Sequence, residues 1–247
     1  MLSKIKDKIV YLFSGYFSQL LVFLILLFLF RPYNRGLIYI GIWEFFVTCV
    51  FIAAIFNAHH PKAIKIICVC LAIPALVLDW ITLHTFITDF ALLSLVLTLF
   101  FMVICTASIL YNVVLRARVT LETLRGVICA YFMIGFVFSL IYMIVEYITP
   151  GSFRLPSGDN MPFFYATEFL SKMVYFSFIT LLTIGFGDIV AMSDLAQTFV
   201  IIEGILGQFY IAILVSRIVG VYSSYTEKGL VKSIHEDIKN LSTKLKK

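Results

Sequence analysis

Residues 183–188, with the sequence Thr-Ile-Gly-Phe-Gly-Asp, could coordinate a desolvated cation. An ion that loses its water shell needs a replacement shell of oxygens, which backbone carbonyls can supply without a fixed charge. An ordinary run of L-residues cannot aim every carbonyl at one axis. Residues whose backbone alternates between right-handed and left-handed (positive φ) conformations can. Glycine reaches positive φ at little steric cost, so Gly185 and Gly187 meet this requirement at every second position.

The other residues of this run are expected to have different roles. Thr183 adds a hydroxyl at one end, and the side chains of Ile184 and Phe186 are expected to turn away from the ions and pack behind the backbone. At membrane depth, unpaired backbone groups are tolerated only inside protein or along a watery path. One strand cannot encircle an ion, so several copies of the chain must contribute.

The run from Thr183 to Gly187 resembles the selectivity-filter signature of the tetrameric potassium channel family. The resemblance implies a fourfold homotetramer. It also implies that K⁺ is bound by the Thr183 hydroxyl and by the carbonyl oxygens of Thr183, Ile184, Gly185 and Phe186.

The resemblance extends to both sides of this signature. Residues 175–178, Tyr-Phe-Ser-Phe, are similar to the aromatic-rich pore helix of the family, and Asp188 matches the acid that follows the filter. Residues 203–208 and 216–220 are similar to the inner helix of bacterial members. The specific likeness covers about residues 124 to 225, and the first half resembles the family only in its number of spans.

The sequence also departs from the family pattern. Leu182 stands where a second threonine is common, and Ile179 stands where some members carry a buried acid. Asp188 is therefore expected to use Tyr175 as its partner, with Thr180 as a further support of the filter. None of these changes removes a carbonyl ligand, so potassium selectivity is expected to survive.

The composition defines an integral membrane protein, because 62% of the residues are apolar and only 13% are charged. A soluble domain is nearer half apolar and a quarter charged. The net charge of +5 arises from basic residues at span ends and in the C-terminal region, which indicates topology rather than nucleic-acid binding.

The apolar runs predict six membrane-spanning helices, each near the 20 or so residues that a bilayer requires. They are Ile9–Phe30, Leu37–Phe56, Ala63–Leu83, Phe86–Leu115, Leu124–Ile148 and Leu195–Tyr222. A further stretch, Phe163–Ile184, carries two charged residues and ends in a Thr/Gly cluster, which predicts a re-entrant pore helix. The expected fold is an all-α integral membrane protein, with the pore helix and filter between helices five and six.

With the N-terminus in the cytoplasm, 15 of the 19 lysines and arginines fall on the inner side. This predicts a multi-pass protein of the cell (plasma or inner) membrane with both termini cytoplasmic. Three parts are expected: a four-helix transmembrane domain over residues 1–115, a pore domain over 116–225 and an amphipathic tail helix over 226–247.

The last predicted span is expected to line the inner cavity through Gln208, Ile211 and Val215. Gly207 is either the bending point of the gate or a residue of close helix packing, and packing is the expectation for Gly204. Glu203, inside the same span, lies either near the filter or in a buried hydrogen bond to the pore helix.

The fourth predicted span lacks a voltage sensor. Residues 90–115 contain no lysine, arginine, aspartate or glutamate, whereas a sensor needs charges that move through the field. Glu44 and Asp79 lie in the second and third spans, nearer the outside. We expect weak or no voltage dependence.

Apolar residues of the tail recur at heptad spacing; they are Val231, Ile234, Ile238, Leu241 and Leu245. Two structures fit this pattern, a parallel four-helix bundle below the pore and a basic amphipathic helix on the inner leaflet.

The expected function is passive conduction of K⁺ without a cofactor. The expected partners are three further copies of the chain and membrane lipid, with no nucleic acid and no small-molecule substrate apart from K⁺. Two alternatives remain, a less selective cation channel and a non-conducting scaffold or receptor with a degenerate pore. Phe186 argues against the first, and the intact filter argues against the second. An enzyme is not expected, because the sequence shows no carboxylate pair, nucleophile–base pair or phosphate loop.

Overall fold

The computed structural model describes residues 15–30, 37–56, 62–85, 90–115, 121–156 and 166–213, together with residues 216 and 220. Helices make up most of these ranges. In chain order the elements are α2 (Tyr16–Leu29), α3 (Leu37–Phe56), α4 (Lys62–Thr85), α5 (Ala91–Leu115), α6 (Leu121–Ile148), β1 (Phe153–Arg154), α7 (Ala166–Leu181) and β2 (Val190–Ala191). One more helix, here called the C-terminal helix, runs over Asp194–Ile213.

Four helices of the described residues are long and apolar enough to cross a membrane. They are Lys62–Ile81, Ala91–Val113, Glu122–Ile148 and Asp194–Ile213. Two shorter apolar helices, Phe17–Leu29 and Gly41–Phe56, precede them. A helix satisfies its backbone groups internally, as hydrocarbon demands, so this is a helical, multi-pass membrane protein. The prediction that six helices span the membrane is not tested by these four.

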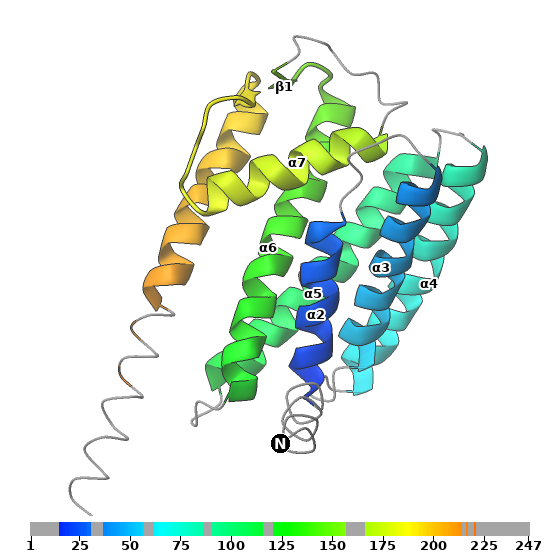
Figure 1. The fold of residues 1–247 in the computed structure, drawn as a ribbon, viewed down its shortest axis with the longest axis vertical. Coiled ribbons are helices and arrows are strands. Elements are labelled where there is room, and N and C mark those ends of the chain that lie inside the picture. Colours follow the sequence, from blue (N-terminus) through cyan, green and yellow to red (C-terminus); the bar gives the residue numbers. More distant parts are fainter. Residues whose placement is uncertain are drawn as a thin grey trace, which may run out of the picture. The chain divides into compact units, whose positions relative to one another are not determined.

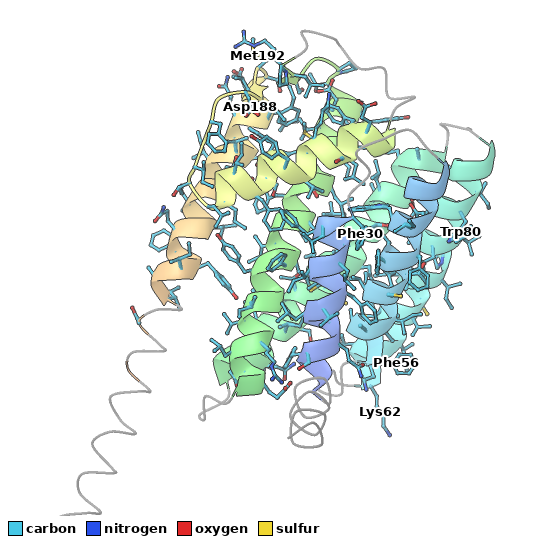
Figure 2. All side chains as sticks on the ribbon, viewed as in Figure 1. Phe30, Phe56, Lys62, Trp80, Asp188 and Met192 are labelled. Carbon is cyan, nitrogen blue, oxygen red and sulfur yellow. The ribbon has the colours of Figure 1, made fainter. Side chains whose placement is uncertain are left out.

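Large apolar side chains on the outside of the helices agree with a lipid environment. Phe56 at the end of α3 is largely exposed and Trp80 on α4 is about half exposed, and Figure 2 shows both pointing outward. Soluble proteins rarely expose extended apolar surface of this kind.

Two compact units, Met1–Gln208 and Phe209–Lys247, make up the chain. In the first unit, α2 packs against α3 and α6, α4 packs against α3 and α5, and α5 packs against α6 (Figure 1). Helix α6 also packs against α7, which crosses it at a steep angle in Figure 1. Helix α6 therefore connects α7 to the helices that precede it in the chain.

The contact of α7 with its neighbours centres on Phe178. Its ring lies 4.8 Å from that of Phe28 on α2, and 5.6 and 5.7 Å from those of Phe132 and Phe136 on α6, between ring centroids. Gly135 makes this approach possible, because a Cβ there would lie only 2.7 Å from the Phe178 ring. Aromatic packing thus holds α7 against the helices before it.

A short β-strand follows each of α6 and α7, and the two strands pair with each other in antiparallel orientation. Strand β1 (Phe153–Arg154) pairs with β2 (Val190–Ala191), and the backbone N–H of Met192 donates to the carbonyl of Ser152 over 2.7 Å. Figure 2 shows Met192 near Asp188 at this end of the unit. Strands of two residues are too short to show alternation in the sequence.

Candidate functional site

Residues 183–188 begin two positions after the end of α7 and have the alternating backbone hand expected from the sequence. The φ angles of Thr183, Gly185 and Gly187 are +57°, +56° and +76°, whereas no positive φ occurs at Ile184 or Phe186. Positive φ costs glycine little, but it is uncommon for threonine. The left-handed conformation of Thr183 was not predicted, because the residue types favour it only at the glycines.

The start of this segment is fixed by the end of α7. The backbone N–H groups of Ile184 and Gly185 donate to the carbonyl of Ile179, over 2.8 and 3.3 Å, and that of Thr183 donates to the carbonyl of Thr180 over 2.9 Å. These bonds satisfy carbonyls that a helix C-terminus otherwise leaves open. The negative end of the α7 dipole therefore lies beside the segment, where it favours a cation.

Gln208 of the C-terminal helix contacts the same end of the segment. Its side-chain amide donates to the Thr183 hydroxyl over 3.1 Å, and that hydroxyl donates to the Leu182 carbonyl over 2.7 Å. A Cβ added at Gly207 would overlap the carbonyl oxygen of Leu181. The structure thus places Gln208 beside Thr183 and shows Gly207 as a residue of close packing, while a hinge role for Gly207 stays a prediction.

Asp188 closes the other end of the segment. The Tyr175 hydroxyl of α7 donates to the Asp188 carboxylate over 2.8 Å, which is the partnership that the sequence led us to expect. The same carboxylate accepts the backbone N–H of Ile189 over 3.1 Å. Thr180 bonds instead to the Phe176 carbonyl of its own helix, so its support of the filter stays a prediction.

The side chains of Ile184 and Phe186 do not pack behind the backbone within one chain. Ile184 is 49% exposed and Phe186 is 70% exposed. Within one chain this side of the segment is uncovered, so the expected packing of these side chains in an assembly stays a prediction. A covering surface would have to come from another molecule.

A buried polar network lies next to the segment and was only partly foreseen. Glu203 is fully buried; one of its oxygens accepts a hydrogen bond from Tyr142 of α6, and the other contacts the Ser177 hydroxyl of α7. Ser177 also donates to the Gly135 carbonyl over 2.7 Å. The expected hydrogen bond between Glu203 and α7 is present, but no feature of the sequence pointed to Tyr142 or Gly135.

The remaining residues singled out in the last predicted span are Gly204, Ile211 and Val215. Gly204 has no neighbour within 4 Å of an added Cβ among the described residues, so the packing role expected for it stays a prediction. Ile211 is exposed and belongs to the second unit. Val215 and the heptad residues of the tail lie outside the described residues.

A family model described as an ion channel matches residues 144–224, which include the end of α6, α7, the 183–188 segment and the C-terminal helix. The match confirms the resemblance to an ion channel family over these residues. No curated protein and no solved structure matches the chain. Residues 144–224 are therefore similar to an ion channel domain, a class of domain that conducts ions passively.

Proposed function

We propose that the chain is one subunit of a potassium-selective channel that works as a homotetramer, with residues 183–187 as its selectivity filter. The main evidence is the positive φ at every second residue, Thr183, Gly185 and Gly187, just after α7. The ion channel match over residues 144–224 supports this assignment.

The chemistry follows from backbone oxygens. Carbonyls of Thr183, Ile184, Gly185 and Phe186, with the Thr183 hydroxyl, would replace the hydration shell of K⁺ as ions pass in single file. The C-terminus of α7 adds a favourable dipole for a cation. The electrochemical gradient drives the movement, so no cofactor is needed.

A fourfold assembly would complete the site. One strand cannot encircle an ion, and the exposed side chains of Ile184 and Phe186 would be covered by neighbouring subunits. In this proposal six helices span the cell membrane, α7 is re-entrant, both termini are cytoplasmic and membrane lipid surrounds the assembly. Domain boundaries near residues 115 and 225 remain part of the proposal.

The test compares potassium and sodium flux into liposomes that contain purified protein. Gly185→Ala should abolish flux, because alanine at a φ of +56° is strained and shifts the carbonyls of the segment. Gly151→Ala is the matched control, since Gly151 also has a positive φ, +82°, but lies in the loop after α6. Native mass spectrometry should give four times the chain mass of 28.1 kDa.

The outcomes separate the alternatives. Potassium flux well above sodium flux, lost in Gly185→Ala and kept in Gly151→Ala, supports the proposal. Equal flux of both ions would instead indicate a less selective cation channel. A folded tetramer that stays silent across pH and membrane tension would indicate a scaffold with a degenerate pore.

A further inference from the structure

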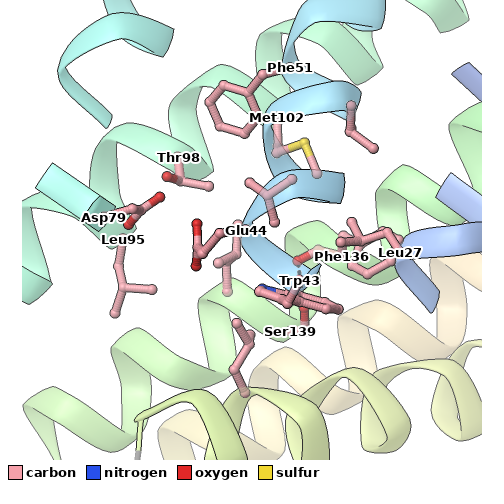
Figure 3. A pocket seen from close by; sticks show the side chains of 14 residues that line it. Leu27, Trp43, Glu44, Phe51, Asp79, Leu95, Thr98, Met102, Phe136 and Ser139 are labelled. Atoms are coloured by element: carbon pink, nitrogen blue, oxygen red, sulfur yellow. Dashed lines mark hydrogen bonds between the residues drawn. The ribbon is translucent and has the colours of Figure 1, made fainter. Parts of the chain in front are cut away.

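A cavity of about 90 Å³ lies among α2, α3, α4, α5, α6 and α7, away from the 183–188 segment (Figure 3). Its walls are mostly aliphatic and aromatic side chains, with four polar ones: Glu44, Asp79, Thr98 and Ser139. One water-sized group needs about 10–15 Å³ of such volume, so the cavity has room for roughly six. Mostly apolar pockets with a few convergent polar groups are typical of small-molecule sites.

Two polar atoms at this cavity lack a hydrogen-bond partner among the residues that the structure describes. They are Oε2 of Glu44, whose residue is only 7% exposed, and the hydroxyl oxygen of Thr98. Figure 3 shows the Glu44 carboxylate turned into the space between α3 and α4. Buried polar groups are almost always hydrogen-bonded, so each such atom requires an explanation.

The charged side chains that line the cavity are all acidic. Asp79 also lines it and accepts a hydrogen bond from Ser94 of α5, while none of the 14 lining residues is basic. Burial of an ionised carboxylate without a counter-charge is very unfavourable. A bound cation would both neutralise Glu44 and supply the donor that Oε2 lacks.

We propose that this cavity binds a small organic ammonium cation, with the Glu44 carboxylate as its counter-ion and the Thr98 hydroxyl as a second acceptor. The rings of Trp43, Phe51 and Phe136 line the same space and attract a cation through their faces. The aliphatic walls accommodate the apolar part of the ligand.

A metal ion fits the cavity less well. Calcium takes six to eight oxygen ligands, and the lining offers few side-chain oxygens beyond the two carboxylates. The described residues contain no group of three or more histidine, cysteine or acidic side chains arranged for a metal. Apolar walls also suit an alkyl chain better than a hydrated ion.

The test uses the fluorescence of Trp43, which lines the cavity. The chain has two tryptophans, so a Trp80→Phe background of the full-length protein in nanodiscs isolates the signal. The probe is isopentylamine, which is protonated at neutral pH like a lysine side chain. Isopentanol, a neutral molecule of similar shape, controls for simple apolar partitioning. Separate titrations with Ca²⁺ and Mg²⁺ test whether the cavity binds a metal ion instead.

The expected result is a saturable change with isopentylamine but not with isopentanol. Affinity should fall about tenfold or more in Glu44→Gln, because the neutral amide removes the charge-assisted hydrogen bond to the ammonium group. It should fall severalfold in Thr98→Val and stay unchanged in Glu168→Gln, whose carboxylate pairs with Lys172 outside the cavity.

Three results would overturn the proposal: no saturation with the amine, equal affinity for isopentanol, or saturation with Ca²⁺ or Mg²⁺ while the amine has no effect. If Glu44→Gln does not fold, Thr98→Val and the comparison with isopentanol decide the question. The site does not depend on ion conduction, so its failure would leave the channel proposal intact, and the reverse also holds.

Discussion

The hydroxyl of Ser177 has one proton and two neighbours that could receive it. One is the carbonyl of Gly135, 2.7 Å away, and the other is a carboxyl oxygen of Glu203. A carbonyl can only accept. All three groups are therefore satisfied when Ser177 donates to Gly135 and a protonated Glu203 donates to Ser177. Tyr142 then donates to the second oxygen of Glu203.

This arrangement predicts that Glu203→Gln is tolerated, whereas Glu203→Ala is not. A glutamine amide can donate to Ser177 while its oxygen accepts from Tyr142. Alanine removes the acceptor of the buried Tyr142 hydroxyl, at a cost of about 1–3 kcal/mol, and also removes the contact with Ser177. It should lower both the melting temperature and the flux. Glu168→Ala, on the partly exposed side of α7, is the control. A glutamine variant as unstable as the alanine one would contradict the assignment.

Single residues show what the sequence could and could not reveal. The partnership of Asp188 with Tyr175 was predictable, because an acid after the 183–187 run needs a donor and α7 offers one nearby. The contact of Glu203 with Tyr142 was not, because the two residues are far apart in the chain. The exposure of Ile184 and Phe186 was also missed, since the expectation assumed a complete assembly.

At the level of helices, the close approach of the C-terminal helix to α7 depends on Gly207. A Cβ there would overlap the Leu181 carbonyl, so Gly207→Ala should separate the helix from the end of α7, lower the melting temperature and reduce flux. Gly204→Ala is the matched control in the same helix, because its Cβ meets nothing within 4 Å among the described residues. Alanine there should be neutral or stabilising by up to about 1 kcal/mol.

Stability separates the two roles of Gly207. If Gly207 acts only as a hinge, alanine should raise helix stability while it impairs opening, so a higher melting temperature with lower flux would contradict the packing role. Loss of stability in Gly204→Ala would indicate that this face contacts another copy of the chain.

Helix bounds were predictable wherever an apolar run ended in a clear break. The second predicted span coincides with α3, Leu37–Phe56. The pore-helix prediction reached Ile184, but α7 ends at Leu181, because the left-handed backbone at Thr183 cannot continue a helix. Which faces of the helices meet, and hence the cavity at Glu44, depends on tertiary packing that apolar runs alone do not encode.

For the whole molecule, the proposed pore would be incomplete within one chain. The backbone geometry of the 183–188 segment is present in one chain, yet its apolar side chains are open on one side. The sequence predicted assembly from the need to encircle an ion, and the exposed surface gives an independent reason for the same expectation.

Voltage should have little effect on this molecule. One charge that crosses the membrane field is worth about 2.3 kcal/mol per 100 mV, but α5, Ala91–Leu115, contains no charged residue. Glu44 is buried, and Asp79 accepts a hydrogen bond from Ser94, so neither carboxylate is placed to move through the field. In planar bilayers with symmetrical K⁺, open probability should be nearly constant between strong negative and positive potentials, and Asp79→Asn should not change this profile. Steep activation in the parent that disappears in Asp79→Asn would instead show that a carboxylate on α4 carries the gating charge.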